Sequence, residues 1–289
     1  MEKVFWLAPM AGVTDLAFRI MKRRYGVFGH KISMAFTEMV SSRALHYNDK
    51  KTMELLKTNE EDSPLGVQIF GSEPEIMGEA AAKICEMGIA NIIDINMGCP
   101  ARKIVKNGDG SALMRDLPLA EKVIRAVVRE ANVPVTVKMR IGLSDGDMTA
   151  IELAKIAEAC GVCAVTVHGR TVEQEYRGRA DWGKIGQVAR SVRIPVVGNG
   201  DISAGFSVPD ELAGVMVARG AYGGDLENAA EHLDLINEHK GGHIGVLEAR
   251  KVMLWYLKGA REAAELKRRA VLATDFGEMK AIIREAREK

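Results

Sequence analysis

Polar side chains stand at the ends of several short apolar runs in this sequence. Gln68 follows Val67, Lys138 follows Val137, and His168 follows Val167. A buried strand needs no terminal lysine or histidine for its stability, and desolvating a bare ammonium group is costly. We therefore expect these side chains to face a ligand. The runs that end in this way are Val67-Gln68, Ile93-Asp94-Ile95-Asn96, Val135-Thr136-Val137-Lys138, Val165-Thr166-Val167-His168 and Val196-Val197-Gly198-Asn199.

Cys99 lies between Gly98 and Pro100, directly after one of these runs. A structural cysteine is usually buried within a helix or strand and is inert, whereas Cys99 is expected in a loop at the ligand-binding end. Its position therefore favours a chemical role. Cys160 and Cys163 form a C-x-x-C pair, which by itself suggests a metal or redox site. Zinc needs four ligands, so packing is the better interpretation and no metal site is predicted.

Two glycine-containing turns follow the last two apolar runs. Gly198-Asn199-Gly200 and Ala218-Arg219-Gly220 occupy positions where barrels of parallel strands commonly bind a phosphate through backbone N–H groups. The sequence has no G-x-G-x-x-G after a strand and no G-x-x-x-x-G-K-[ST], so neither a Rossmann nor a Walker site is indicated. The residues together predict a phosphate-bearing planar cofactor that faces Cys99.

Alternating apolar and amphipathic segments predict the fold that must position these groups. Runs buried on both faces are typical of parallel strands, and helical periodicity lies between them, for example over residues 80–87, 119–130 and 151–159. We therefore expect an α/β fold, a (β/α)8 TIM barrel whose ligand groups lie where strands pass into loops. Residues 201–213 are close to the minimum length for a parallel crossover, so a short or distorted helix is expected there. Strands are expected to begin near Val4, Ala35, Leu65, Ile92, Val135, Ala164, Val196 and Val215.

The pattern is helical only from about residue 225 onward. Helices expected over residues 229–237, 247–258, 263–273 and 277–288 form a small bundle docked on the barrel. We therefore divide the chain into a catalytic barrel, residues 1–225, and a helical domain, residues 226–289. Residues 241–289 hold 11 Lys and Arg against 7 Asp and Glu, a balance of +4 in a chain of net charge +1. This basic tail permits a polyanionic partner, although a solvated helical surface explains it equally well.

Length and composition set the remaining bounds. The chain of 289 residues fits one barrel of roughly 250 residues with a small appendage. Its four cysteines are too few for a disulfide scaffold, which fits a reducing compartment. No apolar run reaches the ~18 residues of a membrane span, and Pro9 interrupts the apolar stretch of residues 4–13. We expect a soluble, cytoplasmic protein with no membrane partner.

An ordered series of motifs resembles the dihydrouridine synthase family, flavoenzymes that reduce the 5,6 double bond of particular uridines in transfer RNA. The series runs in the family's order over nearly the whole chain, which is not expected by chance. The matching stretches are Ala8-Pro9-Met10-Ala11-Gly12-Val13-Thr14-Asp15, Val67-Gln68-Ile69-Phe70-Gly71, Asn96-Met97-Gly98-Cys99-Pro100 with Lys103 and Gly108-Asp109-Gly110, Lys138-Met139-Arg140, His168-Gly169-Arg170-Thr171 with Gln174, Tyr176, Gly178 and Ala180-Asp181-Trp182, and Gly198-Asn199-Gly200-Asp201.

The resemblance implies FMN at the carboxyl end of the barrel, with NADPH or NADH as a transient reductant. It also implies that Cys99 is the acid, because in this family reduced flavin gives hydride to uracil C6 and the thiol protonates C5. A thiol with the ordinary pKa of ~8.5 is mostly protonated near neutrality and can donate. The implied cofactor-binding residues are Ala8, Pro9, Met10, Gln68, Lys138, His168, Asn199, Gly200, Arg219 and Gly220.

The resemblance also implies tRNA as the partner, and no stable protein partner is inferred. A uracil inside folded RNA must be turned out into the pocket before it can react. We expect Asn96 to bond the base edge, and Lys103, Lys106 and Arg170 to approach phosphates. The basic tail is expected to hold the RNA backbone through Arg250, Lys251, Lys258, Arg261, Lys267, Arg268 and Arg269.

The chain departs from the family pattern in three places. Residues 201–213 are fewer than usual, Tyr222-Gly223-Gly224-Asp225 replaces an Asn-Pro-Trp stretch, and Val252 stands where a histidine often follows Arg-Lys. The short segment predicts a looser phosphate end and weaker FMN binding. Two alternatives stay open: an FMN-dependent barrel dehydrogenase acting on a small pyrimidine-like substrate, which leaves the basic tail unexplained, and a non-enzymatic RNA-binding protein that has lost its flavin.

Overall fold

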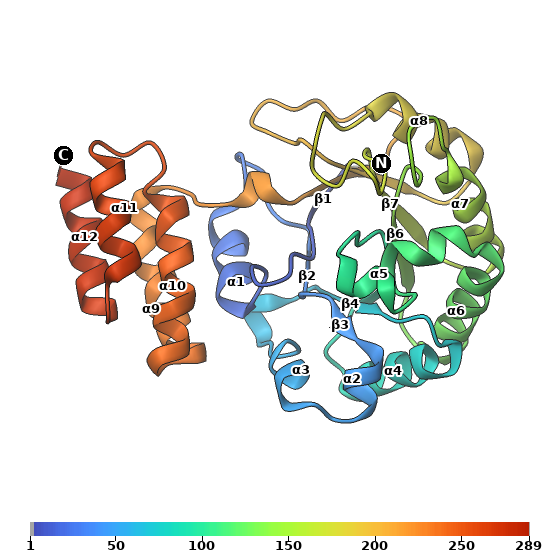
Figure 1. Cartoon of the computed structure of the whole chain (residues 1–289), viewed down its shortest axis with the longest axis horizontal. Coiled ribbons are helices and arrows are strands. Elements are labelled where there is room, and N and C mark those ends of the chain that lie inside the picture. The colour runs from blue at the N-terminus through green and yellow to red at the C-terminus, as the bar shows by residue number, and fades with distance from the viewer. Residues whose placement is uncertain (1–2, 289) are drawn as a thin grey trace.

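A closed ring of parallel strands carries a separate group of C-terminal helices in the computed structural model, which describes residues 3–288 (Figure 1). Each of the eight ring strands pairs in parallel with both neighbours. The predicted TIM barrel is confirmed, and every expected strand begins within one residue of its predicted start. The ring strands are β1 (Val4–Leu7), β2 (Met34–Phe36), β4 (Leu65–Phe70), β5 (Ile92–Met97), β6 (Val135–Arg140), β7 (Ala164–His168), β8 (Val196–Asn199) and β9 (Gly214–Val217).

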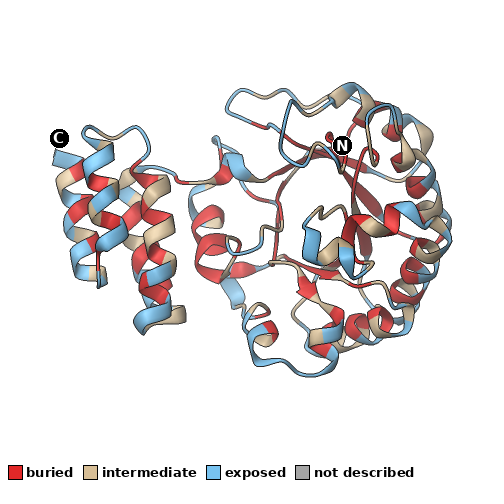
Figure 2. Ribbon diagram, viewed as in Figure 1, coloured by how far each residue is buried: buried red, intermediate tan, exposed pale blue. Residues whose placement is uncertain are grey.

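Helices surround this ring on its outer side (Figure 1). The three periodic segments that predicted helices lie in α4 (Pro74–Glu86), α6 (Leu117–Glu130) and α7 (Thr149–Ala159), except residue 87, which directly follows α4. Each of these helices begins earlier than the periodicity indicated. Strands are buried almost throughout, whereas the helices alternate buried and exposed positions (Figure 2). The helices are α1 (Leu16–Tyr25), α2 (Ser42–His46), α3 (Lys50–Glu54), α4 (Pro74–Glu86), α5 (Arg102–Lys106), α6 (Leu117–Glu130), α7 (Thr149–Ala159) and α8 (Trp182–Ser191), with short 3-10 turns η1 (Glu60–Asp62), η2 (Gly110–Arg115), η3 (Arg219–Ala221) and η4 (Leu226–Asn228).

The connection between β8 and β9 contains no helix, so the expected short or distorted helix over residues 201–213 is wrong. Gly205 adopts a φ of 77°, and Pro209 removes a backbone donor, so both residues oppose a continuous helix. In place of a helix, individual side chains of this connection pack on the outside of the barrel. The ring of Phe206 packs on Trp182 of α8 with 4.4 Å between ring centroids. A two-residue strand, β3 (Val40–Ser41), pairs with β4 and was not predicted.

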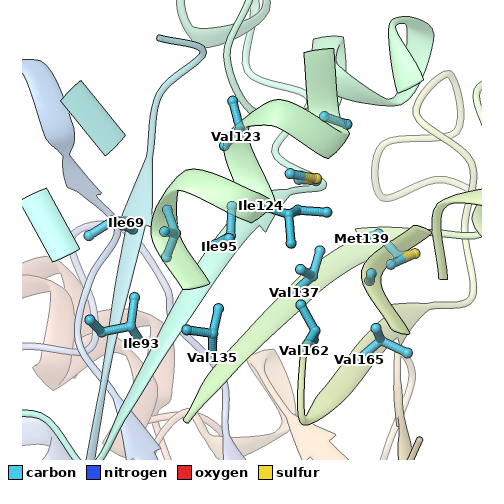
Figure 3. Close-up of a cluster of buried hydrophobic side chains, with 14 of the residues drawn as sticks. Ile69, Ile93, Ile95, Val123, Ile124, Val135, Val137, Met139, Val162 and Val165 are labelled. Atoms are coloured by element: carbon cyan, nitrogen blue, oxygen red, sulfur yellow. The ribbon is translucent and has the colours of Figure 1, made fainter. Parts of the chain in front are cut away.

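The side chains of each ring strand alternate between the helices and the barrel interior. Ile93 and Ile95 of β5 pack outward against Val123 and Ile124 of α6 (Figure 3). Asp94, which lies between the two isoleucines, therefore points into the barrel. A charged residue inside an otherwise apolar strand is thus placed among the interior residues rather than in the core beneath the helices.

The barrel interior has two chemically different halves. We name the apolar half for a buried cluster that lies mainly on β1, β2, β8 and β9. It consists of Trp6, Ala8, Met34, Phe36, Ala164, Val197 and Met216, of which Ala8 directly follows β1 and Ala164 begins β7. We name the polar half for inward side chains on β4, β5, β6 and β7, which are Gln68, Asp94, Asn96, Thr136, Lys138 and Thr166. The strand alternation assigns both sets to the same interior.

The C-terminal residues form four helices, as predicted: α9 (Ala229–Lys240), α10 (Gly242–Tyr256), α11 (Ala263–Leu272) and α12 (Phe276–Glu288). We call these four helices the bundle. The bundle docks on α1, because Leu16, Ile20 and Met21 of α1 belong to the same buried cluster as Leu233 and Met253 of the bundle. The division of the chain at residue 225 stays a prediction. In the described residues, every helix is too short or too polar to cross a bilayer.

Candidate active site

A cavity of about 870 Å³ opens where the carboxyl ends of the ring strands meet. This volume lies in the range of pockets that enclose a cofactor or a small ligand. Strand ends that are far apart in sequence converge on it, as expected for a parallel barrel. Twelve predicted site residues line the cavity: Ala8, Pro9, Met10, Gln68, Asn96, Cys99, Lys138, His168, Asn199, Gly200, Arg219 and Gly220.

Lys138 brings a positive charge to the cavity wall. Its Nζ donates a hydrogen bond to Asn199 Oδ1 at 3.3 Å, and Asn199 Nδ2 donates to the carbonyl of Met216 at 2.5 Å. Burial, followed by the charge of Arg140, lowers the pKa of Lys138 to about 8, so the ammonium form prevails at neutral pH. Within residues 3–288, Asn199 is the one hydrogen-bond partner of this group, and an ammonium has three donors. Lys138 can therefore bind acceptor atoms of a ligand.

His168 presents a neutral ring to the same cavity. Burial, followed by the charges of the nearby cations Lys138 and Arg140, lowers the pKa of His168 to about 2. Its Nε2 lies 3.4 Å from Nη1 of Arg170. Because a guanidinium only donates, Nε2 accepts in this contact and the ring proton resides on Nδ1. A ligand beside His168 meets an uncharged donor and not a cation.

Glycines and an arginine form the wall at the ends of β8 and β9. Gly200 adopts a φ of 121°, and a Cβ atom there would lie 2.6 Å from Cβ of Ala180. A Cβ atom at Gly220 would lie 2.5 Å from the carbonyl oxygen of Ile202. Both positions therefore require glycine, which leaves backbone accessible to a ligand. Arg219 adds a positive charge beside them, a combination that suits an anionic group.

A line of hydrogen bonds leads from the barrel interior to the cysteine loop. Gln68 Nε2 donates to Asp94 Oδ2 at 2.6 Å. Asn96 Nδ2 donates to Gln68 Oε1 at 2.8 Å. Asn96 Oδ1 then accepts from the backbone N–H groups of Gly98 at 3.1 Å and Cys99 at 2.9 Å. The side chain of Asn96 therefore fixes the start of the loop that carries the thiol.

Other contacts hold the cysteine loop from the opposite side. The Cys99 carbonyl accepts from the N–H of Ser111 at 3.1 Å, and a Cβ atom at Gly110 would lie 3.0 Å from that carbonyl oxygen. Arg140 Nε donates to the carbonyl of Gly98 at 2.8 Å. Cys99 itself is half-buried and lines the cavity. Its thiol is therefore held at a fixed place, next to the space where a ligand would lie.

Sequence reasoning missed several residues of this site. Asp94 and Arg140 were present in the motifs but were given no role. Tyr176 and Tyr222 also line the cavity, and the Tyr176 ring lies over the guanidinium of Arg219 at 4.8 Å. The signal that could have identified Asp94 is a carboxylate flanked by isoleucines in a buried strand, since an unpaired charge there would be costly.

Arg170, which was expected to approach an RNA phosphate, is buried and bound to Asp201, so its role toward RNA stays a prediction that these contacts do not support. The residue is 3% exposed, and its Nη2 donates to both carboxylate oxygens of Asp201 at 2.7 and 2.8 Å. It also donates to the carbonyl of Gly178 at 2.8 Å. Arg170 therefore ties the loop after β7 to the loop after β8. Lys103 and Lys106 are exposed on α5, outside the cavity wall but directly after the cysteine loop.

The basic residues of the bundle divide into two groups. Arg250 donates twice to the carbonyl of Ala273, at 3.0 and 2.8 Å, where α11 ends. Lys251 donates to the carbonyl of Gly12, in the loop after β1. Both residues thus hold the chain together instead of standing free for RNA. Of the remaining basic residues, Arg268 pairs with Glu265 and Arg269 with Glu285, whereas Lys258 and Arg261 are exposed and Lys267 is half-buried.

The C-x-x-C pair has one buried member. Cys160 is buried as expected, but Cys163 is exposed, so packing does not explain that residue. Within the part of the chain that the structure describes, no group of three or more His, Cys, Asp or Glu side chains could hold a metal ion.

Comparisons with known proteins identify the family to which the chain is similar. The family profile described as dihydrouridine synthase (Dus) matches residues 6–224. A probable tRNA-dihydrouridine synthase of Rickettsia conorii is 41% identical, covering 93% of this chain and 88% of the relative. A probable tRNA-dihydrouridine synthase 1 of Synechocystis is 36% identical, covering 96% and 85%. The tRNA-dihydrouridine synthase B of Xanthomonas axonopodis pv. citri is 36% identical, covering 90% and 86%.

Proposed function

Because the chain belongs to the dihydrouridine synthase family, we propose that it reduces the 5,6 double bond of uridine in tRNA, with FMN as cofactor and NADPH or NADH as reductant. One observation carries this proposal. Cys99 lines the same cavity as the ten residues predicted to bind the cofactor. An acid and a cofactor site that face one another are what a hydride-and-proton addition requires.

The groups around the cavity suit a planar ring with polar edges and a phosphate. Lys138 has donors to spare, and Gln68 Nε2 has a second hydrogen beyond the one given to Asp94. We assign these two residues and His168 to the polar edge of the flavin ring. Ala8, Pro9 and Met10 would contact its face, while Asn199, Gly200, Arg219 and Gly220 would hold the ribityl phosphate.

The chemistry follows from the placement of Cys99. FMN held by these residues would, in its reduced form, be the source of the hydride that adds to C6 of the uracil. The thiol of Cys99 gives its proton to C5, so the double bond becomes a single bond and a thiolate remains. Lys138 and Arg140 line the same cavity as this group. A proton from solvent then restores the thiol for the next turnover.

The uridine has to leave its stack in the RNA to reach Cys99. Asn96 holds the cysteine loop, and its Nδ2 donates to Gln68 Oε1 at 2.8 Å and to the weak acceptor Sδ of Met39 at 3.6 Å. A base oxygen would replace the sulfur as the acceptor of this second hydrogen. Exposed lysines of α5 flank the same loop, and the exposed Lys258 and Arg261 of the bundle would bind the RNA backbone in a salt-dependent way.

The test is to delete the gene and to map dihydrouridine in tRNA by nucleoside sequencing. We expect dihydrouridine to disappear from its tRNA position, and to return with the wild-type gene but not with Cys99→Ala. Unchanged nucleoside content in the deletion strain would refute the proposal. Reoxidation of the reduced flavoprotein by free uracil or orotate, unaffected by tRNA, would instead select a dehydrogenase of small pyrimidines.

A further inference from the structure

We propose that Asp94 is a positioning residue for Cys99, acting through Gln68 and Asn96. Asp94 is fully buried in the middle of β5 and lies below the cavity wall. It does not line the cavity itself and makes no hydrogen bond to the cysteine loop, but it bonds the lining residue Gln68. The hydrogen bonds that connect it to the loop pass through the two amide side chains of Gln68 and Asn96. This inference rests on the proposed function, because it assigns the group that places the acid of that reaction.

The direction of every hydrogen bond in this line is set at its buried end. An ionised carboxylate only accepts, so Asp94 requires the amide nitrogen of Gln68 to face it. The Gln68 oxygen then faces Asn96 and requires that residue's nitrogen. Asn96 is thereby left with its oxygen toward the two N–H groups of the cysteine loop. The carboxylate of Asp94 thus fixes the orientation of the Gln68 amide, and the Gln68 amide fixes that of the Asn96 amide.

The reversed line would fail at the cysteine loop. If the amide of Asn96 turned by 180°, its NH₂ group would face the backbone N–H groups of Gly98 and Cys99. Three donors would then meet without an acceptor, and a buried unsatisfied donor costs about 1–3 kcal/mol. Gln and Asn amides are nearly symmetric in shape, so packing alone does not choose between the two orientations. An acceptor-only group at the start of the line does choose.

A second bond holds Asp94 in place. Thr136 Oγ1 donates to Asp94 Oδ1 at 2.6 Å, which occupies the oxygen that Gln68 does not use. A neighbouring charge, that of Lys138, also acts on Asp94. The carboxylate could therefore serve either as the start of the hydrogen-bond line or as a counter-charge. Any test has to separate the direction of the hydrogen bonds from the charge.

Two substitutions make this separation. Asp94→Asn removes the charge and can keep the direction. Its oxygen can accept from Gln68 while its nitrogen donates to the hydroxyl of Thr136, and the backbone N–H groups of Gly98 and Cys99 still disfavour the reversed orientation. Asp94→Leu removes both the charge and the direction in a side chain of similar size. A positioning role predicts that the asparagine variant behaves as the wild type and that the leucine variant does not.

The readout is amide hydrogen exchange, measured by mass spectrometry on the purified flavoprotein without substrate. We expect Asp94→Leu to raise the exchange rates at Gly98 and Cys99 about tenfold or more, and Asp94→Asn to change them less than about threefold. The start of α12 in the bundle is the internal control, because Asp275 Oδ1 accepts from the N–H of Glu278 at 2.9 Å in the same manner and shares no hydrogen bond with the cysteine loop. Its exchange should stay unchanged in both variants.

Two outcomes would overturn the proposal. Unchanged exchange at Gly98 and Cys99 in Asp94→Leu would show that the loop holds itself, and equally fast exchange in Asp94→Asn would show that charge matters and not direction. If Asp94→Leu does not fold, Gln68→Leu breaks the next bond and must loosen the same two amides. The measurement involves no uridine, so it can fail while tRNA reduction stands, or succeed where reduction is not found.

Uridine reduction supplies a second readout. Asp94→Leu should lower kcat by a larger factor than it raises KM for tRNA, because the thiol is displaced and, of the proposed RNA contacts, only that of Asn96 is affected. Asp94→Asn should restore kcat. A loss of kcat in both variants, with wild-type exchange rates, would contradict the positioning role.

Discussion

The two halves of the barrel interior lie on different strands of one sheet and have different roles. In the apolar half, Phe36 lies on Gly66 and 5.5 Å from the ring of Trp6, and it takes part only in packing. In the polar half, Asp94, Gln68 and Asn96 form directed hydrogen bonds that end at the cysteine loop. The apolar half thus stabilises the fold, whereas the polar half positions reactive groups and lowers the stability of the fold. Substitutions in the two halves should therefore fail in different ways.

The largest expected effect lies at the end of the polar half. Cys99→Ala should lower the rate of uridine reduction by about 10²- to 10⁴-fold, the usual contribution of a positioned general acid. Flavin content and melting temperature should stay unchanged, because the side chain is half-buried and its loop is held by backbone contacts. Cys163→Ala is the matched control and should keep full activity. Single-turnover reduction of tRNA measures both, and a Cys99→Ala rate within fivefold of wild type would contradict the assignment.

A substitution in the apolar half should have the opposite profile. Phe36→Ala should lower the free energy of unfolding by about 3–5 kcal/mol, because it removes a fully buried ring from the barrel interior. The folded fraction should retain its rate of reduction. Urea denaturation and single-turnover kinetics at 15 °C provide the two measurements. If Phe36→Ala lowered the rate of uridine reduction without lowering the free energy of unfolding, the two halves would not differ in role.

Lys138 tests the polar half at the cavity wall. Lys138→Met should weaken FMN binding about 10- to 100-fold, since it removes a charge-assisted hydrogen bond. The pKa of Lys138 is lowered to about 8, so its charge is present below pH 8 and is lost as the pH rises through 8. The wild-type affinity should therefore fall above pH 8, and the affinity of the variant should not. Fluorescence titration of the flavin-free protein from pH 6.5 to 9.5 decides the matter, and parallel curves would contradict it.

The smallest effect should be a gain. Burial raises the pKa of Asp94 to about 6 from its ordinary 3.8, so the folded chain holds this proton to a higher pH than the unfolded chain. The associated stability is complete below pH 4 and is lost as the pH rises through 6. Asp94→Asn has no such loss and should be more stable than wild type at pH 7 by about 1–3 kcal/mol. Urea denaturation at pH 4.5 and 7 measures this difference, and a destabilised variant at pH 7 would contradict it.

The strands were predictable because each is an apolar run bounded by turns, and burial on both faces leaves no other interpretation for eight such runs. Residues 201–213 were not predictable in the same way. Chain length indicated a crossover, but a crossover needs only to span the distance between β8 and β9, and side chains such as Phe206 can cover the barrel without a helix. β3 pairs through only two residues, which is too short to leave a pattern in the sequence.

The cavity residues were predictable because parallel strands bring their carboxyl ends together, whatever else the chain does. The basic residues were not, because their partners lie far away in sequence. Arg170 donates to Asp201, Arg250 to the carbonyl of Ala273, and Lys251 to the carbonyl of Gly12. A positive charge in a sequence indicates only that a partner is needed. The fold decides whether that partner is RNA or the protein itself.

Helix α1 belongs to both parts of the molecule, since its apolar side chains complete the core of the bundle while its first residue follows the loop that lines the cavity. The bundle cannot swing away without exposing Leu16, Ile20 and Met21 to water. The distance from the bundle's outer surface to the thiol is therefore a fixed length. For a tRNA bound to that surface, only a nucleotide that lies at this distance from the bound part of the RNA would reach the sulfur of Cys99.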